Sequence, residues 1–363
     1  MAFFNARAGA TTNGCDLSKD IEVPAGPADS VSALAFSPVS NHLAVSSWDN
    51  GVRIYEVGQG VQGRASYEHQ APALDVCWSR DGTKVFSGGI DNAGRMYDVQ
   101  TGTPSQVAQH DGPIKATRFT DMHGGLLVTA SWDKKIKYWD LRTPNPIGTL
   151  ELVERCYSMD LRQHLLVAAT AERQIHLVDL RNPTVFFGQP TESPVKYQTR
   201  SVAVMPDAHG YAIGGIEGRV GIQFVSEPKP LPDYTFRCHR AGEKLQQKKD
   251  GSTAHIFAVN ALAFHPFHTM SCLSAGADGV FTMWDIQNKK LLKNHDLKSS
   301  DGKTNQNMPV SAAAFSNING GNILAYAVSY DWAHGHRGNF SGHPNKVMLH
   351  ELKDEDIKPK PNK

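Results

Sequence analysis

The strongest constraint on the fold is a unit of about 40 residues that recurs along the whole chain. Its clearest copy is SWDKKIKYWD, from Ser131 to Asp140, where a tight turn at Trp132 and Asp133 precedes an alternating strand. Every copy contains a strand, a turn, a second strand, a tight turn and a third strand, in that order. A unit this small cannot bury both faces of its sheet alone, so neighbouring copies must pack against one another.

Seven copies can be aligned by the residue that precedes the acidic end of the third strand. This position is occupied by Tyr55, Tyr97, Trp139, Val178, Gln223, Trp284 and His350. The first four gaps are 42, 42, 39 and 45 residues, and the last two, 61 and 66, are lengthened by insertions. Gaps of about 40 to 45 residues are typical of WD repeats. The sequence therefore predicts an all-β protein with the fold of a seven-bladed WD-repeat β-propeller.

Ring closure and the domain boundaries follow from the two ends of the repeat array. Asp20 to Val23 form a short strand without a neighbour, and the seventh copy supplies only three strands. We expect Ile21 and Val23 to pair beside Val347 to Leu352, because this removes an exposed sheet edge. The predicted organisation is a loose segment at 1–19, a propeller at 20–352 and a charged tail at 353–363 that lies on the surface or is disordered.

The composition excludes several classes of protein. The formal net charge of +1 over 363 residues excludes a uniformly basic nucleic-acid-binding surface, although not a local basic patch. No apolar run approaches the roughly 20 residues of a membrane-spanning helix, and the opening is too short in apolar length for a secretory signal. The five cysteines form no C-x-x-C pair. These features predict a protein without a membrane span that stays inside the cell with reduced thiols.

Motifs for catalysis and for metal binding are absent from the sequence. There is no nucleophile elbow, P-loop or dinucleotide-binding glycine motif, so neither an enzyme nor a cofactor is predicted. The histidines at the C-terminal end, His334, His336, His343 and His350, have no carboxylate or cysteine at ligand spacing, so no metal site is predicted.

Acidic residues recur at the tight turn of each unit. They are Asp49, Asp91, Asp133, Asp278 and Asp331, with Glu172 and Glu217 at the same position. We interpret them as acceptors that fix the turn by binding backbone N–H groups or a loop histidine such as His69 or His110.

The residues beside these turns indicate a binding face. The turns between second and third strands lie at one end of a propeller, so Trp48, Trp132 and Trp332 should surround one mouth, and Arg173 and Arg219 should face the same end. Tryptophan and arginine are enriched at binding hot spots, since one buries a large rigid area and the other grips carboxylates with two hydrogen bonds. The alternative is that each tryptophan packs against the neighbouring blade. As a group, they predict a binding site for an extended acidic peptide.

A second candidate site is basic. Residues 219–249 contain seven lysines and arginines against three acidic residues. Arg237 and Arg240 lie in this segment with Phe236, and Lys289 and Lys290 follow in the next unit. Cations beside an aromatic ring suit single-stranded nucleic acid. The competing interpretation is a solvated charged loop.

Several motifs resemble one known family. They are VERCYS (153–158), ATAERQI (169–175), KYQTR (196–200), IEGRV (216–220), FRCHR (236–240) and VNALAFHP (259–266). They resemble the WD-repeat messenger-RNA export factor of the nuclear pore and its sister, the mitotic-checkpoint WD protein that partners checkpoint kinases. SYDWAHGH (329–336) separates the two and favours the export factor. The sequence departs from the family at Ala333-His334 and at the insertion RGNFSGHPN.

The resemblance implies a non-enzymatic nuclear-pore adaptor in messenger-RNA export. Such proteins bind a GLEBS segment, an acidic hairpin of a phenylalanine-glycine nucleoporin, through residues that match Trp48, Trp132 and Arg219. A side groove that matches Phe236 and Trp284 is implied to take nucleic acid. The implied location is the nucleus, at the nuclear pore complex and nuclear envelope, with shuttling to the cytoplasm. The alternatives are a checkpoint adaptor that binds GLEBS-like segments of checkpoint kinases, and a direct binder of single-stranded RNA.

Overall fold

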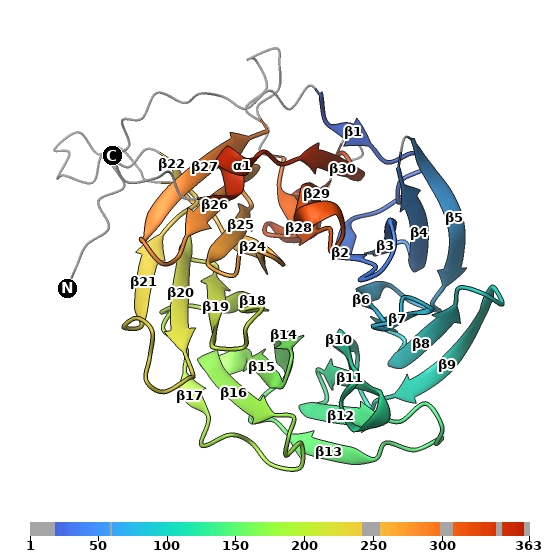
Figure 1. Cartoon of the computed structure of the whole chain (residues 1–363). Helices are drawn as coiled ribbons and strands as arrows, with labels where there is room; N and C mark the ends of the chain where they lie inside the picture. The colour runs from blue at the N-terminus through green and yellow to red at the C-terminus, as the bar shows by residue number, and fades with distance from the viewer. Residues whose placement is uncertain (1–18, 59, 242–254, 298–307, 339–342, 359–363) are drawn as a thin grey trace, which may run out of the picture.

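Seven four-stranded antiparallel sheets stand around a central axis like the blades of a propeller (Figure 1). This arrangement comes from a computed structural model that describes residues 19–58, 60–241, 255–297, 308–338 and 343–358. The predicted fold class is therefore confirmed. Among the described residues, no helix has the length and hydropathy needed to cross a bilayer.

Each of the first four blades is formed by consecutive strands, numbered from the axis outward. Blade one contains β2 (Val31–Phe36), β3 (His42–Ser47), β4 (Gly51–Val57) and β5 (Val61–Glu68). Blade two contains β6 (Ala73–Trp78), β7 (Lys84–Gly89), β8 (Ala93–Asp98) and β9 (Thr103–Gln109). Blade three contains β10 (Ile114–Thr120), β11 (Leu126–Ser131), β12 (Lys135–Trp139) and β13 (Gly148–Glu151). Blade four contains β14 (Cys156–Arg162), β15 (Leu165–Thr170), β16 (Gln174–Asp179) and β17 (Thr191–Glu192).

The last three blades follow the same order, with additions. Blade five contains β18 (Thr199–Val204), β19 (Gly210–Gly215), β20 (Arg219–Phe224) and β21 (Tyr234–Arg237), and a small ribbon pairs β22 (Arg240–Ala241) with β23 (His255–Ile256). Blade six contains β24 (Val259–Phe264), β25 (Ser271–Gly276), β26 (Val280–Asp285) and β27 (Lys290–Asp296). Blade seven contains β28 (Val310–Phe315), β29 (Ile323–Val328) and β30 (Lys346–Glu351), joined by β1 (Ile21–Glu22). The helical elements are 3-10 turns at Met122–Gly124, Ala171–Arg173, Asn319–Gly321 and Gly335–Gly338, and helix α1 (Asp354–Ile357).

The N-terminal strand closes the ring as predicted. Ile21 pairs with Leu349 in antiparallel register, and the Val23 amide donates to the Val347 carbonyl at 2.8 Å. β1 thus occupies the outer edge of blade seven, beside β30 (Figure 1). The two ends of the chain thus pair in one sheet, and blade seven gains its fourth, outermost strand from the N-terminus.

The tail departs from the expectation over its first residues. Instead of a loose surface segment, residues 354–357 form α1, and Ile357 is buried. The reason is hydrophobic packing, because Ile357 and Leu352 join a core cluster with Phe281 and Tyr326. The Ser271 hydroxyl also donates to the Ile357 carbonyl. The predicted loose segment 1–19 and the tail end 359–363 fall almost entirely outside the described residues.

The core lies between adjacent blades. Second strands such as β15 are buried at every position, because each sheet is covered on both faces by its neighbours. Phe86 of blade two and Phe119 of blade three stack at 5.2 Å between ring centroids. Burial of a side chain such as Phe86 contributes about 2 to 3 kcal/mol. This packing explains why the strands read as apolar runs rather than as strict alternation.

Candidate peptide-binding face

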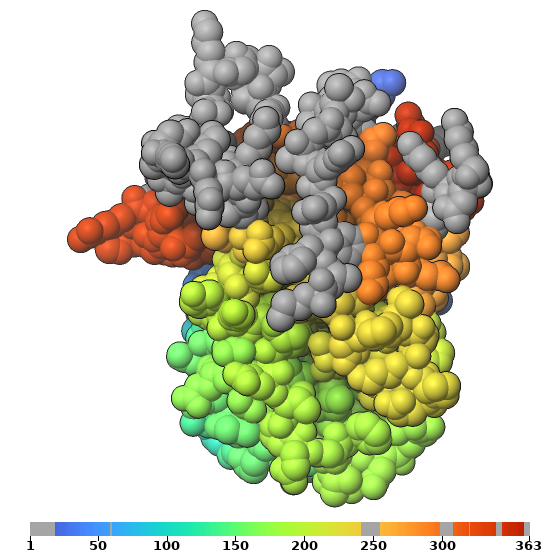
Figure 2. All heavy atoms as spheres, turned by 90° about the vertical axis from the view of Figure 1, so that its left-hand side faces the viewer, coloured from blue at the N-terminus to red at the C-terminus, as the bar shows by residue number. Residues whose placement is uncertain are grey.

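The turns between second and third strands lie at one end of the propeller, which we call the top face. Because every blade has the same strand order, topology places the five predicted residues at this end. Trp48, Trp132, Arg173 and Trp332 lie in these connections, and Arg219 begins the third strand of blade five. The blade-seven segment ending at Gly338 protrudes from one flat face of the disc (red-orange, at the left of Figure 2).

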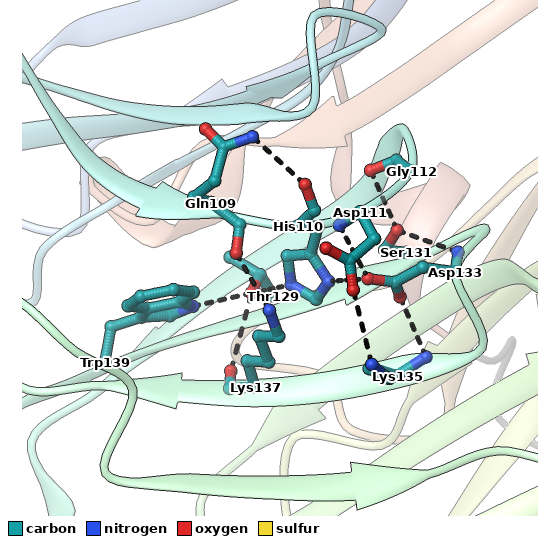
Figure 3. A network of polar contacts seen from close by, with 10 residues as sticks. All are labelled: Gln109, His110, Asp111, Gly112, Thr129, Ser131, Asp133, Lys135, Lys137 and Trp139. Carbon is teal, nitrogen blue, oxygen red and sulfur yellow. Dashed lines mark hydrogen bonds and ion pairs between the residues drawn. The ribbon is translucent and has the colours of Figure 1, made fainter.

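A buried hydrogen-bond chain holds the turn that carries Trp132 (Figure 3). Trp139 Nε1 donates to Thr129 Oγ1 at 2.8 Å, Thr129 Oγ1 lies 2.7 Å from His110 Nε2, and His110 Nδ1 lies 2.8 Å from Asp133 Oδ2. Asp133 also accepts the Lys135 amide at 3.0 Å, which fixes the turn. Burial lowers the pKa of His110 by more than Asp133 raises it. The imidazole is therefore neutral at pH 7, with Nδ1–H donating to Asp133 and Nε2 accepting from Thr129.

Blades two and six contain similar chains. In blade two His69 joins Asp91 to Ser87, and in blade six His239 joins Asp278 to Ser274. These contacts confirm the predicted turn-fixing role, with His69 and His110 as partners. Backbone N–H groups are also accepted by Asp49, Asp91, Asp278, Asp331 and Glu217. Glu172 differs, since it lies within a 3-10 turn at a φ of 59°.

The three tryptophans divide into a pair and a single residue. Trp48 and Trp332 contact each other across the junction of blades one and seven, with ring centroids 5.9 Å apart. Trp332 is 36% exposed and has a φ of 61°, a conformation that costs an L-residue about 1 kcal/mol. Trp132 is 37% exposed, and no aromatic ring of the described residues pairs with it. Aromatic packing across a blade junction therefore accounts for part of the Trp48 environment, and no such ring contact is made by Trp132 within the described residues.

The two arginines are bonded differently. Arg173 donates to the carbonyls of Val195 and Ser193 at 3.0 and 3.2 Å, and it pairs with Glu192 at 3.0 Å. Its guanidinium is thus occupied by its own blade. Arg219 Nε lies 3.5 Å from a Glu217 carboxylate oxygen, and this buried nitrogen makes no hydrogen bond in the structure. Arg219 is the arginine with donors left for a ligand.

Four exposed apolar residues on the top face escaped prediction. They are Val153, Tyr197, Ile216 and Ile256, with exposed fractions of 52%, 60%, 40% and 49%. Ile216 lies in the second-to-third-strand turn of blade five, whereas Val153, Tyr197 and Ile256 lie in segments that lead into the first strand of the next blade. Both kinds of connection lie at the top face. The Lys196 amide donates to Glu217 at 2.5 Å, which holds the Tyr197 loop beside the Arg219 turn. The sequence signal that could have found them was an apolar residue within a predicted connection, where polar residues are expected.

The predicted nucleic-acid groove is wrong in its aromatic part. Phe236 and Trp284 are 4% and 6% exposed, and they pack together with ring centroids 4.7 Å apart. Trp284 Nε1 donates to Ser274 Oγ at 2.9 Å, which makes Trp284 the end of the blade-six hydrogen-bond chain. Both rings are core, because they fill the space between blades five and six, and neither is available to stack on a base.

The basic part of that groove is dispersed. Arg240 Nη2 donates to the Glu217 carbonyl at 2.8 Å, so it supports the blade-five turn. Lys289 Nζ lies 4.4 Å from the centre of the Tyr234 ring. Arg237 and Lys290 are exposed. Residues 242–254, which carry much of the predicted positive charge, lie outside the described part of the chain.

The channel at the axis contains paired charges. A cavity of about 230 Å³ is lined by first strands of the blades and includes Asp75, Arg118 and Asp160. Arg118 binds both carboxylates at 2.8 Å, and the amides of Thr117 and Val204 complete their hydrogen bonding. Groups paired in this way stabilise the junction of blades and are poorly placed for acid or base catalysis.

The closed ring and its buried turn networks define the chain as a WD-repeat β-propeller. The WD domain, G-beta repeat family matches residues 19–56, 63–98, 103–140 and 247–285. The chain is 46% identical over 354 residues to the poly(A)+ RNA export protein of Schizosaccharomyces pombe, covering 96% of this chain and 95% of the relative. It is 41% identical to the mRNA export factor GLE2 of Chaetomium thermophilum, covering 96% and 94%, and 38% identical to Protein Rae1 of Drosophila melanogaster, covering 97% and 99%. The chain belongs to the family of WD-repeat mRNA export factors.

Proposed function

We propose that this protein is a non-enzymatic adaptor in messenger-RNA export that binds the GLEBS segment of a phenylalanine-glycine nucleoporin across its top face. The observation that carries the proposal is Arg219, whose side chain is 26% exposed and makes no hydrogen bond within the described residues, in a blade whose turn and adjoining loop also expose Ile216 and Tyr197. The near-full-length likeness to proteins named as mRNA export factors supports the same role. The proposed location is the nuclear pore complex and nuclear envelope, with shuttling between nucleus and cytoplasm.

The chemistry of the face suits an acidic peptide with apolar side chains. Arg219 would donate two hydrogen bonds to a peptide carboxylate, a geometry that a planar guanidinium favours. Ile216, Tyr197 and Trp132 offer apolar surface that the peptide would remove from water, and this burial is the main favourable term in most protein association. Because the turns are held by buried networks, little ordering of this face is needed on binding.

The test is the affinity of a synthetic GLEBS peptide for the wild-type protein, Arg219→Ala and Arg219→Lys. We expect Arg219→Ala to weaken binding about 30-fold, equivalent to about 2 kcal/mol. Arg219→Lys should recover only part of this loss, since an ammonium group lacks the two-pronged geometry. Arg142→Ala, an exposed arginine in the connection between the third and fourth strands of blade three and hence at the opposite end of the propeller, is the matched control and should bind normally. Unchanged affinity in Arg219→Ala would refute the proposed carboxylate contact.

Two alternatives predict different partners for the same chain. A GLEBS-like peptide from a checkpoint kinase can be compared with the nucleoporin peptide in one competition assay. The peptide that binds this chain more tightly indicates whether its partner is a nucleoporin or a kinase. A higher affinity for the kinase peptide would favour the checkpoint adaptor.

Direct binding of single-stranded RNA is the second candidate function, supported by the exposed cations Arg237 and Lys290. Because Phe236 and Trp284 are buried, such binding would be mainly electrostatic. Its affinity for an RNA oligonucleotide should then fall about 10-fold or more between low and physiological salt, as expected for several phosphate contacts. Binding that does not respond to salt would argue against this mode.

A further inference from the structure

Three buried side chains from separate parts of the chain meet where α1 packs against the propeller. They are His295 of β27, His350 of β30 and Asp356 of α1, with exposed fractions of 0%, 6% and 2%. One potential ligand atom from each lies within 4.8 Å of the others. Figure 1 shows α1 beside β27, close to where β30 ends. The cluster contains none of the proposed peptide-binding residues.

The cluster concentrates unbonded polar atoms in the core. His295 Nδ1, His295 Nε2, His350 Nε2 and Asp356 Oδ1 are buried and make no hydrogen bond. These are four of the 11 such side-chain atoms found in the described residues. A buried polar atom without a partner costs about 1 to 3 kcal/mol, so four of them in one place point to a missing ligand.

Two of the three side chains are already oriented for a ligand. His350 Nδ1 lies 2.7 Å from Asp20 Oδ1, and Asp20 Oδ2 accepts the Tyr326 hydroxyl at 2.7 Å. This leaves the lone pair of His350 Nε2 directed into the cluster, as in carboxylate–histidine–metal arrangements. Asp356 Oδ2 accepts the Lys353 amide at 2.9 Å, which leaves Oδ1 as the unbonded oxygen.

Packing fixes the orientation of the third side chain. The His295 ring stacks on Phe281 with centroids 4.5 Å apart and an interplanar angle of 10°. It also meets the His350 ring edge-on at 4.8 Å. Both imidazoles are therefore held in place before any ligand binds, which reduces the entropic cost of forming a site.

We propose that His295, His350 and Asp356 bind a Zn²⁺ ion, with a fourth position for water. Two imidazoles and one carboxylate are a ligand set that suits Zn²⁺ and disfavours Mg²⁺ and Ca²⁺, which prefer oxygen ligands. Zn²⁺ bonds of about 2.0 to 2.2 Å place tetrahedral ligands about 3.3 Å apart. The ligand atoms now lie within 4.8 Å of one another, so a small inward movement of the short helix α1 would bring them to this distance.

The charges around the cluster are compatible with a divalent cation. Asp20, Glu355 and Asp356 are acidic, and Lys293 is the nearby cation. Lys293 Nζ lies 3.6 Å from Asp356 Oδ1 and 3.5 Å from Glu355 Oε1. An ion bound by Asp356 Oδ1 would displace Lys293 toward Glu355, and it would then face two neutral imidazoles and one carboxylate.

The proposed ion would link the elements that close the ring. Its ligands come from blade six, blade seven and the C-terminal helix, and Asp20 adjoins the closing strand β1. A metal bond at this junction would stabilise ring closure and dock α1 at the same time. No spacing in the sequence indicated this site, because the ligands are spread over residues 295 to 356 and no two lie at a recognised motif spacing.

The experiment uses the full chain, treated with chelator, desalted and then titrated with Zn²⁺. We expect one bound Zn²⁺ per chain by elemental analysis and a rise in Tm of about 3 °C or more at a Zn²⁺ concentration 100 times the Kd. Mg²⁺ should produce no shift. Co²⁺ should give the visible absorption of a four-coordinate nitrogen and oxygen site, a readout that does not depend on stability.

Variants separate this site from adventitious binding by surface histidines. His350→Gln and Asp356→Asn should abolish the Zn²⁺-dependent rise in Tm and the Co²⁺ spectrum. The control His265→Gln removes another fully buried histidine with an unbonded nitrogen, and it should keep both signals. His334→Gln with His336→Gln removes two exposed histidines and should also keep them.

Two results would overturn the proposal. One is a wild-type chain that binds no stoichiometric Zn²⁺ and shows no metal-dependent Tm. The other is a Zn²⁺ signal that persists in both His350→Gln and Asp356→Asn. If a variant fails to fold, the stoichiometry and Co²⁺ spectrum of the wild-type chain still decide the question.

Discussion

Blades three and five solve the same structural problem in different ways. In blade three the turn is held by a chain that runs from Trp139 through His110 to Asp133, and every polar group in it is used internally. In blade five Glu217 accepts the Lys196 amide, and no histidine of the described residues joins it. The blade-five turn instead carries Arg219, with a nitrogen left unbonded. Of these two blades, the one without the buried chain is thus the one that presents a partly exposed guanidinium at the top face.

The comparison shows which residues of a propeller turn can contact a ligand. A residue committed to a buried network stabilises the turn but offers nothing to a ligand. Blade three contributes through Trp132, which the network positions without bonding it. Blade five contributes through polar and apolar side chains together, namely Arg219 and Ile216.

The largest expected effect is on stability, from Asp133→Ala in blade three. The change leaves His110 Nδ1–H and the amides of Asp111 and Lys135 without their acceptor, and we expect a loss of about 3 kcal/mol of unfolding free energy. Urea denaturation measures it. Glu217→Ala is the matched change in blade five and should cost about 1 kcal/mol, since the Lys196 amide loses its acceptor and Arg219 loses a loose ion-pair partner. Equal losses would break the distinction between the two blades.

The next effect is on peptide affinity and compares the two arginines of the top face. Arg173→Ala should weaken binding of the GLEBS peptide less than about 3-fold, against about 30-fold for Arg219→Ala. The reason is that Arg173 is occupied by Val195, Ser193 and Glu192. Calorimetric titration of both variants provides the test. A larger loss for Arg173→Ala would show that internal bonding does not limit a ligand contact.

A smaller effect separates binding from packing among the tryptophans. Trp132→Ala should lower peptide affinity about 10-fold and change the unfolding free energy by less than about 1 kcal/mol, because its side chain is 37% exposed. Trp48→Ala should cost more stability, since its ring packs on Trp332. Fluorescence binding and urea denaturation of both variants are required. The idea fails if Trp132→Ala destabilises more than Trp48→Ala.

The smallest effect is on the pH dependence of stability. The pKa of His110 in the folded chain lies below its ordinary value of 6.5, chiefly because of burial. The unfolded chain therefore binds a proton more readily, and stability falls as the pH drops below about 6.5. His110→Gln should reduce the slope of unfolding free energy against pH between 6.5 and 5. An unchanged slope would show that His110 is not among the groups that titrate on unfolding.

Local sequence patterns predicted much of this architecture. The repeat spacing, the closing strand and the turn aspartates with His69 and His110 all depend on contacts within a blade or between adjacent copies, and these contacts are confirmed. The five top-face positions followed from strand order alone. That they bind a peptide stays a prediction.

Other features depended on packing that no local pattern records. Phe236 and Trp284 looked available beside basic residues, yet the junction of blades five and six buries them. Arg173 and Arg219 looked equivalent in sequence, and only their neighbours show that one is occupied. The tail looked loose because it is charged, whereas Ile357 anchors it to the core.

The sequence by itself determined the number of blades, their closure and the end of the ring to which each turn belongs. It did so because repeat period and strand alternation are properties of neighbouring residues. Only the tertiary structure decided which side chains are free and brought His295, His350 and Asp356 together. The physical reason is that burial and hydrogen-bond satisfaction depend on groups that are distant in the chain and become neighbours when the ring closes.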